Sequence, residues 1–93
     1  MVKFDTGRLV MTRTVNDEIA DSEKFAKDIT AAIKKYLFCD WGEMCRDDKK
    51  MNDNAIKTGE DRIFAAYPTS AGKIYITTEH DRSYTTIMFA DEY

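Results

Sequence analysis

The sequence predicts a single α+β domain over residues 1–93, with a short N-terminal strand, two to three helices and a three-stranded antiparallel meander packed on the main helix. Three observations support this prediction. Apolar residues recur at helical spacing between residues 22 and 38. After Gly59 the spacing becomes strand-like in three successive runs. The length of 93 residues suits one domain with one modest core.

The N-terminal part is expected to contain a strand and two helices. Residues 7–13 are rich in β-favouring side chains and predict a first strand that joins the edge of the sheet. Thr14, followed by Asp17, predicts the N-cap of a short helix that ends near residue 20. Ser22 predicts the cap of the main helix, at residues 23–38. The apolar face of this helix consists of Phe25, Ile29, Ile33 and Tyr36.

A third helix is expected at residues 43–57, with Gly59 as a left-handed cap at its end. Its apolar stripe is thin, so we expect this helix to be largely exposed. The stripe consists of Met44, Met51, Ala55 and Ile56. Strand-like runs follow at residues 61–67, 73–79 and 83–89. The segments between them have the length of turns, which predicts two hairpins.

The second of these runs shows how the sheet should be placed. Ile74 and Ile76 alternate with Tyr75 and Thr77. Successive side chains of a strand point to opposite faces of the sheet, so one face is apolar and the other carries Tyr and Thr. We therefore expect the apolar face to pack on the main helix and the other to be partly hydrated.

Composition excludes several classes of function. The chain has 14 basic and 17 acidic residues and a net charge of −3, which disfavours direct nucleic-acid binding through bulk charge. No apolar run approaches the ~18 residues of a membrane span. The N-terminus lacks the apolar stretch of a secretory signal. A cytoplasmic protein is the expectation.

No motif predicts catalysis. Paired carboxylates for hydrolysis, a glycine-rich phosphate loop and a G-x-S-x-G turn are all absent. The run Glu79-His80-Asp81-Arg82 offers His80 as a general base, but a solvated turn is favoured because consecutive hairpin residues point in different directions. Cys39 and Cys45 match no common zinc or redox spacing. We expect no catalytic residue, no cofactor and no metal site, and hence no enzyme.

Acidic residues are the most informative feature of the sequence. They gather in residues 14–24 (four acids, one base), 40–61 (seven acids, four bases) and 79–93 (four acids, one base), each with net charge −3. One interpretation is an ordinary solvated surface. The other is an acidic surface that meets a basic partner, because opposed potentials speed encounter and fix register. The candidate contact residues are Asp40, Trp41, Glu43, Asp47, Asp48 and Asp53.

Trp41 has two interpretations of its own. It is the sole tryptophan and lies beside Gly42 in the connection between two predicted helices. It can close the end of the core where the main helix stops. Alternatively, it is an exposed contact, since tryptophan is enriched in binding hot spots.

Several stretches together resemble a family of small plasmid-related proteins found on bacterial plasmids, phages and other mobile elements. They are Gly7–Thr12, Asp40–Glu43, Asp61–Tyr67, Lys73–Glu79 and Asp81–Tyr93. The resemblance implies a genomic setting more than an activity, and it carries no catalytic role over to any residue. Small acidic proteins of such elements include inhibitors of host defence, among them anti-CRISPR proteins, which bind a nuclease or an RNA-guided complex and block its DNA channel.

Two functions therefore stay open. The first is a non-enzymatic inhibitor that binds a basic protein surface, such as that of a CRISPR effector or another nuclease, through the acidic residues of the central block. The alternative is a plasmid or phage regulator that touches DNA directly. Its basic residues would be Lys27, Lys34, Lys35, Arg8 and Arg13. A small enzyme that uses His80 ranks last.

Overall fold

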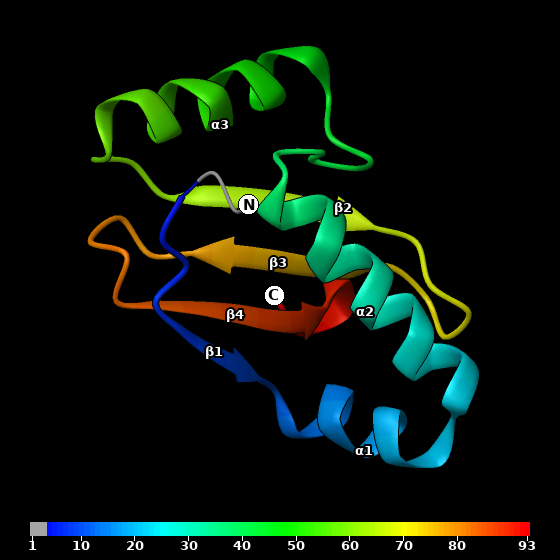
Figure 1. The fold of residues 1–93 in the computed structure, drawn as a ribbon. Coiled ribbons are helices and arrows are strands. Elements are labelled where there is room, and N and C mark those ends of the chain that lie inside the picture. Colours follow the sequence, from blue (N-terminus) through cyan, green and yellow to red (C-terminus); the bar gives the residue numbers. More distant parts are fainter. Residues whose placement is uncertain (1–3) are drawn as a thin grey trace.

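The computed structural model describes residues 4–93 and confirms the α+β prediction (Figure 1). Each of the predicted helices and strands is present, and a short 3₁₀ helix follows the last strand. The elements in chain order are β1 (Arg8–Met11), α1 (Arg13–Asp21), α2 (Glu23–Leu37), α3 (Arg46–Thr58), β2 (Ile63–Tyr67), β3 (Ile74–Thr78), β4 (Tyr84–Phe89) and η1 (Ala90–Glu92).

The four strands form one mixed sheet in the order β1-β4-β3-β2. Strands β2, β3 and β4 make the predicted antiparallel meander. β1 joins the edge of the sheet, as expected, but it runs parallel to β4, with Arg8 opposite Tyr84 and Met11 opposite Ile87. A parallel pair requires a long connection between its strands, and here all three helices and two strands lie between β1 and β4.

Local side-chain hydrogen bonds fix where the first two helices begin. The hydroxyl of Thr12 accepts the N–H of Val15 at 3.3 Å, so α1 is capped by Thr12 and the predicted cap at Thr14 is wrong. Thr12 also donates to the carboxylate of Glu92 at 3.0 Å, a contact between distant parts of the chain. Ser22 accepts the N–H of Phe25 at 3.2 Å and caps α2 as predicted.

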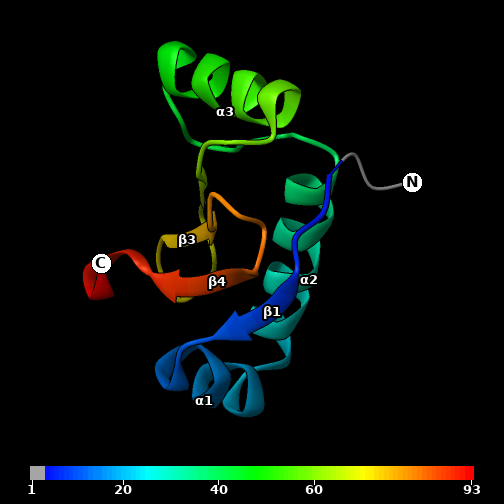
Figure 2. The same ribbon diagram turned by 90° about the vertical axis from the view of Figure 1, so that its left-hand side faces the viewer.

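The core lies between α2 and one face of the sheet (Figure 2). From α2 it receives Phe25, Ile29, Ala32 and Tyr36, all buried. The sheet contributes Ile63, Ala65, Tyr67, Ile74, Ile76 and Ile87. This arrangement confirms the predicted sheet face. No helix within residues 4–93 has the length and apolar character needed to cross a membrane.

A line of hydroxyl groups crosses this apolar interior. The hydroxyl of Tyr36 lies 2.6 Å from that of Thr78, which lies 2.7 Å from that of Thr85. Thr85 in turn donates to the backbone carbonyl of Thr6 at 2.7 Å. Each hydroxyl therefore has a partner, which removes most of the cost of burying it. Burial raises the pKa of Tyr36, so its phenol stays protonated and can donate.

The packing of α3 differs from the prediction. Its buried residues are Asn52 and Ala55, whereas Met51, expected to point inward, is 68% exposed. Asn52 faces the sheet because its amide replaces a missing strand at the β2 edge. It donates to the carbonyl of Phe64 at 2.8 Å and accepts the N–H of the same residue at 3.2 Å. A polar residue thus stabilises an edge that would otherwise expose unpaired backbone groups.

Arg82 fastens the β3–β4 turn to the rest of the fold. Its guanidinium donates to the backbone carbonyls of Asp61, Glu79 and His80 at 2.7, 3.2 and 3.3 Å, and to that of Ala55 at 2.9 Å. Arg82 itself has a φ of 61°, in the left-handed region. The segment Glu79-His80-Asp81-Arg82 is therefore a turn that the side chain of Arg82 holds in place.

Arg82→Lys is expected to lower the free energy of unfolding by about 1.5–3 kcal/mol, because an ammonium cannot reach the same set of carbonyls as the guanidinium fork. Urea denaturation measures this loss. Arg8→Lys is the matched control, since Arg8 is exposed on β1 and the same exchange there should change stability by less than about 0.5 kcal/mol. Equal effects at the two positions would contradict the structural role of Arg82.

Candidate functional site

The candidate site lies where the chain passes from α2 into α3, beside the β2 edge of the sheet. Exposed carboxylates gather here, and we call this set the acidic α3 entrance: Asp40, Glu43, Asp47 and Asp48. The ion pairs found within residues 4–93 join Arg13 to Asp17, Lys27 to Glu23 and Arg62 to Glu79, so none of them neutralises the entrance. Its carboxylates are therefore available to an external cation.

Backbone hydrogen bonds hold the α2–α3 connection against the sheet. The carbonyl of Asp40 accepts the hydroxyl of Tyr67 at 2.6 Å, and its carboxylate accepts the N–H of Gly42 at 3.2 Å. The N–H of Glu43 donates to the carbonyl of Ala66 at 2.7 Å. Gly42 and Ala66 also form a parallel β-bridge. The entrance is thus a fixed extension of the sheet, with little backbone freedom to lose on binding.

The same bonds change how the acids are arranged. The sequence places Glu43 and Asp47 on one face of a helix that begins at residue 43. In the structure α3 begins at Arg46, because residues 42 and 43 are held in the bridge to β2. Glu43 therefore lies outside the helix. Asp47 and Asp48 occupy its first turn, where the positive end of the helix dipole favours negative charge.

Acidic and basic residues are unevenly distributed between residues 40 and 58. Residues 40–48 contain four acids and one base, whereas residues 49–58 contain one acid and three lysines. The acidic excess of residues 40–58 therefore lies at the entrance, and Glu60 and Asp61 add a second acidic pair after α3. The acidic block of residues 40–61 thus has two acidic ends with a basic helical stretch between them.

Trp41 belongs to the core and lies next to Asp40 of the acidic α3 entrance in the chain. Its side chain is only 2% exposed and meets the ring of Tyr36 edge-on at a centroid distance of 5.5 Å. The indole N–H donates to a carboxylate oxygen of Asp53 at 2.9 Å. Of the six residues predicted for the contact surface, Trp41 is thus buried and Asp53 holds it in place. The exposed-contact interpretation of Trp41 is corrected.

A groove separates α3 from the open face of the sheet, and we call it the α3–β2 groove. Its volume is about 230 Å³, and its walls are formed by Met44, Asp48, Met51, Asn52, Arg62 and Phe64. Sequence reasoning missed it because it treated the methionines as core residues. The period-two alternation of a strand, which puts Phe64 on the face opposite that of Ile63 and Ala65, is the sequence signal that could have found it.

Beside the groove, three aromatic rings cover part of the open sheet face. The ring of Phe64 packs on that of Tyr75 at a centroid distance of 4.7 Å. Tyr93 meets both of them edge-on, at 5.4 and 5.6 Å. Figure 2 shows the chain end that carries Tyr93 on the side of the sheet opposite α2. This face is therefore partly aromatic and carries Tyr75 as predicted, whereas Thr77, expected to be hydrated, is only 2% exposed.

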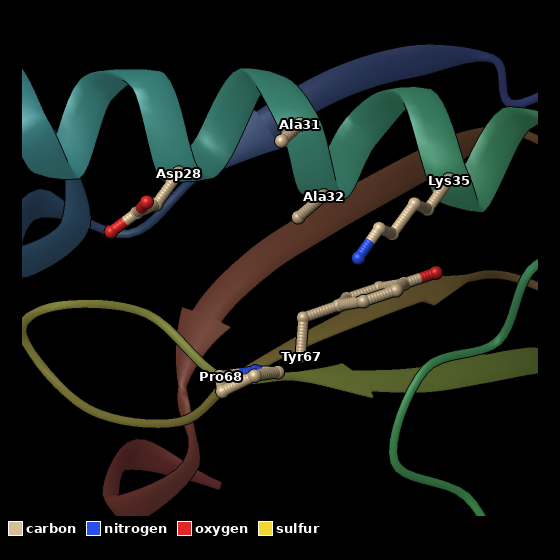
Figure 3. A pocket seen from close by; sticks show the side chains of 6 residues that line it. All are labelled: Asp28, Ala31, Ala32, Lys35, Tyr67 and Pro68. Atoms are coloured by element: carbon tan, nitrogen blue, oxygen red, sulfur yellow. The ribbon is translucent and has the colours of Figure 1, made fainter.

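A second hollow lies between α2 and the end of β2, where Lys35 extends over the ring of Tyr67 (Figure 3). At its far end Asp28 accepts the backbone N–H of Ser70 at 2.8 Å, a bond that lowers the pKa of Asp28 and pins the β2–β3 turn to α2. The hollow measures about 140 Å³. Small-molecule sites usually measure ~300–1,000 Å³, so this hollow is smaller than a usual ligand pocket.

Within residues 4–93, no group of three His, Cys, Asp or Glu side chains is placed to hold a metal ion. Comparison with known proteins adds no family. No family model, no curated protein and no solved structure matches the chain. The resemblance to plasmid-related proteins thus stays a prediction.

The basic residues considered for DNA contact lie on three elements. Lys27, Lys34 and Lys35 belong to α2, Arg13 to α1 and Arg8 to β1. Lys27 lies 3.8 Å from Glu23, and Arg13 lies 3.9 Å from Asp17. Two of these five cations thus already face a carboxylate, which weakens the positive field that a DNA backbone would meet.

Proposed function

We propose that this chain is a non-enzymatic protein of a mobile genetic element that inhibits a host defence complex in the bacterial cytoplasm. It does so by covering a basic, DNA-binding surface of that complex with the acidic α3 entrance. The observation that carries the proposal is the group of exposed carboxylates at Asp40, Glu43, Asp47 and Asp48, which have no cation partner among the ion pairs of residues 4–93.

Two physical arguments support this role. Exposed charges of one sign attract a surface of the opposite sign and accelerate encounter. A backbone already held by hydrogen bonds loses little freedom in the complex, so more of the interaction energy contributes to affinity. The bonds of Asp40, Gly42 and Glu43 to one another and to β2 provide that order before binding.

Charge reversal at the entrance tests the proposal. The double variant Glu43→Lys with Asp47→Lys should fold normally, because both side chains are exposed, and should reduce partner capture by about tenfold or more. The assay is a pull-down of the tagged protein from a defence-competent bacterial lysate, with captured proteins quantified by mass spectrometry. Circular dichroism checks that the variant is folded.

The matched control is Asp17→Lys with Asp21→Lys. These residues are exposed on α1, have the same spacing and undergo the same change of charge. Capture of a CRISPR effector or another nuclease that survives this control and fails in the entrance variant supports the proposal. Retained capture by the entrance variant, or an equal loss in both variants, overturns it. Recovery of DNA alone, released by salt, favours the regulator instead.

A further inference from the structure

The α3–β2 groove has apolar walls that the fold itself does not cover. Met44 is half-buried against the core, Phe64 is half-buried against the ring of Tyr75, and Met51 on the flank of α3 is 68% exposed. Unbranched methionine side chains adapt their shape to a ligand at little cost. The groove therefore offers a slot suited to an aliphatic or planar side chain.

The charge of the groove comes from Asp48 and Arg62. Arg62 precedes β2, and its guanidinium Nε lies 3.9 Å from the carboxylate of Glu79, which follows β3 on the neighbouring strand. This carboxylate compensates the charge of Arg62. The lining thus holds one acid and one base. Arg62 is paired with Glu79, whereas Asp48 belongs to no ion pair within residues 4–93, so its carboxylate is the charged group of the groove that is left to bind a cation.

An arginine side chain fits both properties. Its three methylene groups cover apolar surface while its charged end stays near solvent. Its planar guanidinium stacks on aromatic rings and pairs with a carboxylate through two parallel hydrogen bonds, which a lysine ammonium cannot do. Phe64, supported by Tyr75 and Tyr93, provides the ring, and Asp48 provides the carboxylate.

We propose that the α3–β2 groove binds an arginine side chain of the basic partner, with the methylene stem on Met44, Met51 and Phe64 and the guanidinium on Asp48. This inference rests on the proposed function, because it specifies which residue of the basic surface is recognised. It adds a shape-selective contact to an attraction that would otherwise depend on charge alone.

A capped Ala-Arg-Ala tripeptide is the probe, and the same tripeptide with citrulline, which is neutral and of similar shape, is its control. NMR of the methionine methyl groups follows both titrations. We expect saturable shifts of the Met44 and Met51 signals with the arginine peptide and at least about tenfold weaker binding of the citrulline peptide. Equal responses to the two peptides would overturn the proposal.

Two neighbouring acids make a matched pair of variants. Asp47 and Asp48 both lie exposed in the first turn of α3, but Asp48 lines the groove and Asp47 does not. Asp48→Asn should weaken tripeptide binding by about tenfold, whereas Asp47→Asn should change it by less than about twofold. Equal losses in the two variants would mean that the tripeptide responds only to the overall negative charge of the α3 N-terminus. The groove proposal would then fail.

The failure of this inference is separable from that of the proposed function. The double reversal at Glu43 and Asp47 leaves every groove residue in place, so that variant should still bind the tripeptide. If Asp48→Asn leaves tripeptide binding unchanged while the double reversal abolishes nuclease capture, the groove proposal is overturned and the entrance proposal stands. If Asp48→Asn loses tripeptide binding while the double reversal retains nuclease capture, the entrance proposal is overturned and the groove still binds arginine.

Discussion

Trp41→Ala is expected to lower the free energy of unfolding by about 3–5 kcal/mol, the usual cost of deleting a large buried aromatic side chain. Trp41 is 2% exposed and lies against Tyr36 at the end of the core where α2 stops. Its removal leaves a cavity there and also deprives the carboxylate of Asp53 of the indole N–H. Urea denaturation followed by circular dichroism measures the effect.

Trp41→Phe provides the control for this prediction. Phenylalanine keeps an aromatic ring in the same space and loses chiefly the hydrogen bond to Asp53, so we expect a loss of about 1–2 kcal/mol. If Trp41 were instead a direct contact for the partner, both variants would keep the stability of the parent chain and lose binding. That outcome would contradict the buried position described above.

Gly42→Ala is expected to cost about 2–5 kcal/mol. Gly42 has a φ of 72°, a conformation in which a side chain costs about 1–2 kcal/mol. A Cβ at this position would also overlap the carbonyl oxygen of Ala66 and lie 2.6 Å from Cδ1 of Tyr67. Overpacking of this kind costs a further ~1–3 kcal/mol, because the bridge to β2 must open to relieve it.

Gly59→Ala isolates the backbone part of this effect. Gly59 has nearly the same φ, 70°, but an added Cβ there would have no neighbour within 4 Å. We expect a loss of about 1–2 kcal/mol, which is the conformational cost alone. Urea denaturation gives the free energy of unfolding of each variant. The difference between the two losses is the energy of the close contact between residue 42 and β2. Equal losses would show that the α2–α3 connection does not touch β2 in solution.

The two glycine variants also differ in their expected effect on binding. Gly42 lies between Asp40 and Glu43, so a shift at this residue moves two acids of the entrance. Gly59 lies at the far end of α3. Under the proposed function, partner capture by folded Gly42→Ala protein should fall, whereas capture by Gly59→Ala should match the parent chain.

The amino-acid sequence by itself determined most of the elements of this fold. Helical spacing predicted α2, the Ser22 hydroxyl predicted its cap, and Gly59 predicted the end of α3. Turn-length segments predicted the meander of β2, β3 and β4. These signals are readable because each depends on residues near one another in the chain: a helix face, a cap three residues from its partner, or a hairpin. The exposure of the entrance acids followed from the same local reasoning.

Tertiary structure alone decided the rest, because the deciding partner lies far away in the sequence. The hydroxyl of Thr12 donates to Glu92 at the other end of the chain, and this distant contact helps to place Thr12, and not Thr14, at the cap of α1. Trp41 is buried because Asp53, from the middle of α3, receives its N–H. Asn52 is buried and Met51 exposed because the side-chain amide of Asn52 pairs with the backbone carbonyl and N–H of Phe64 at the β2 edge. The sequence contains these polar groups, but only the folded chain shows which of them must be paired when water is excluded.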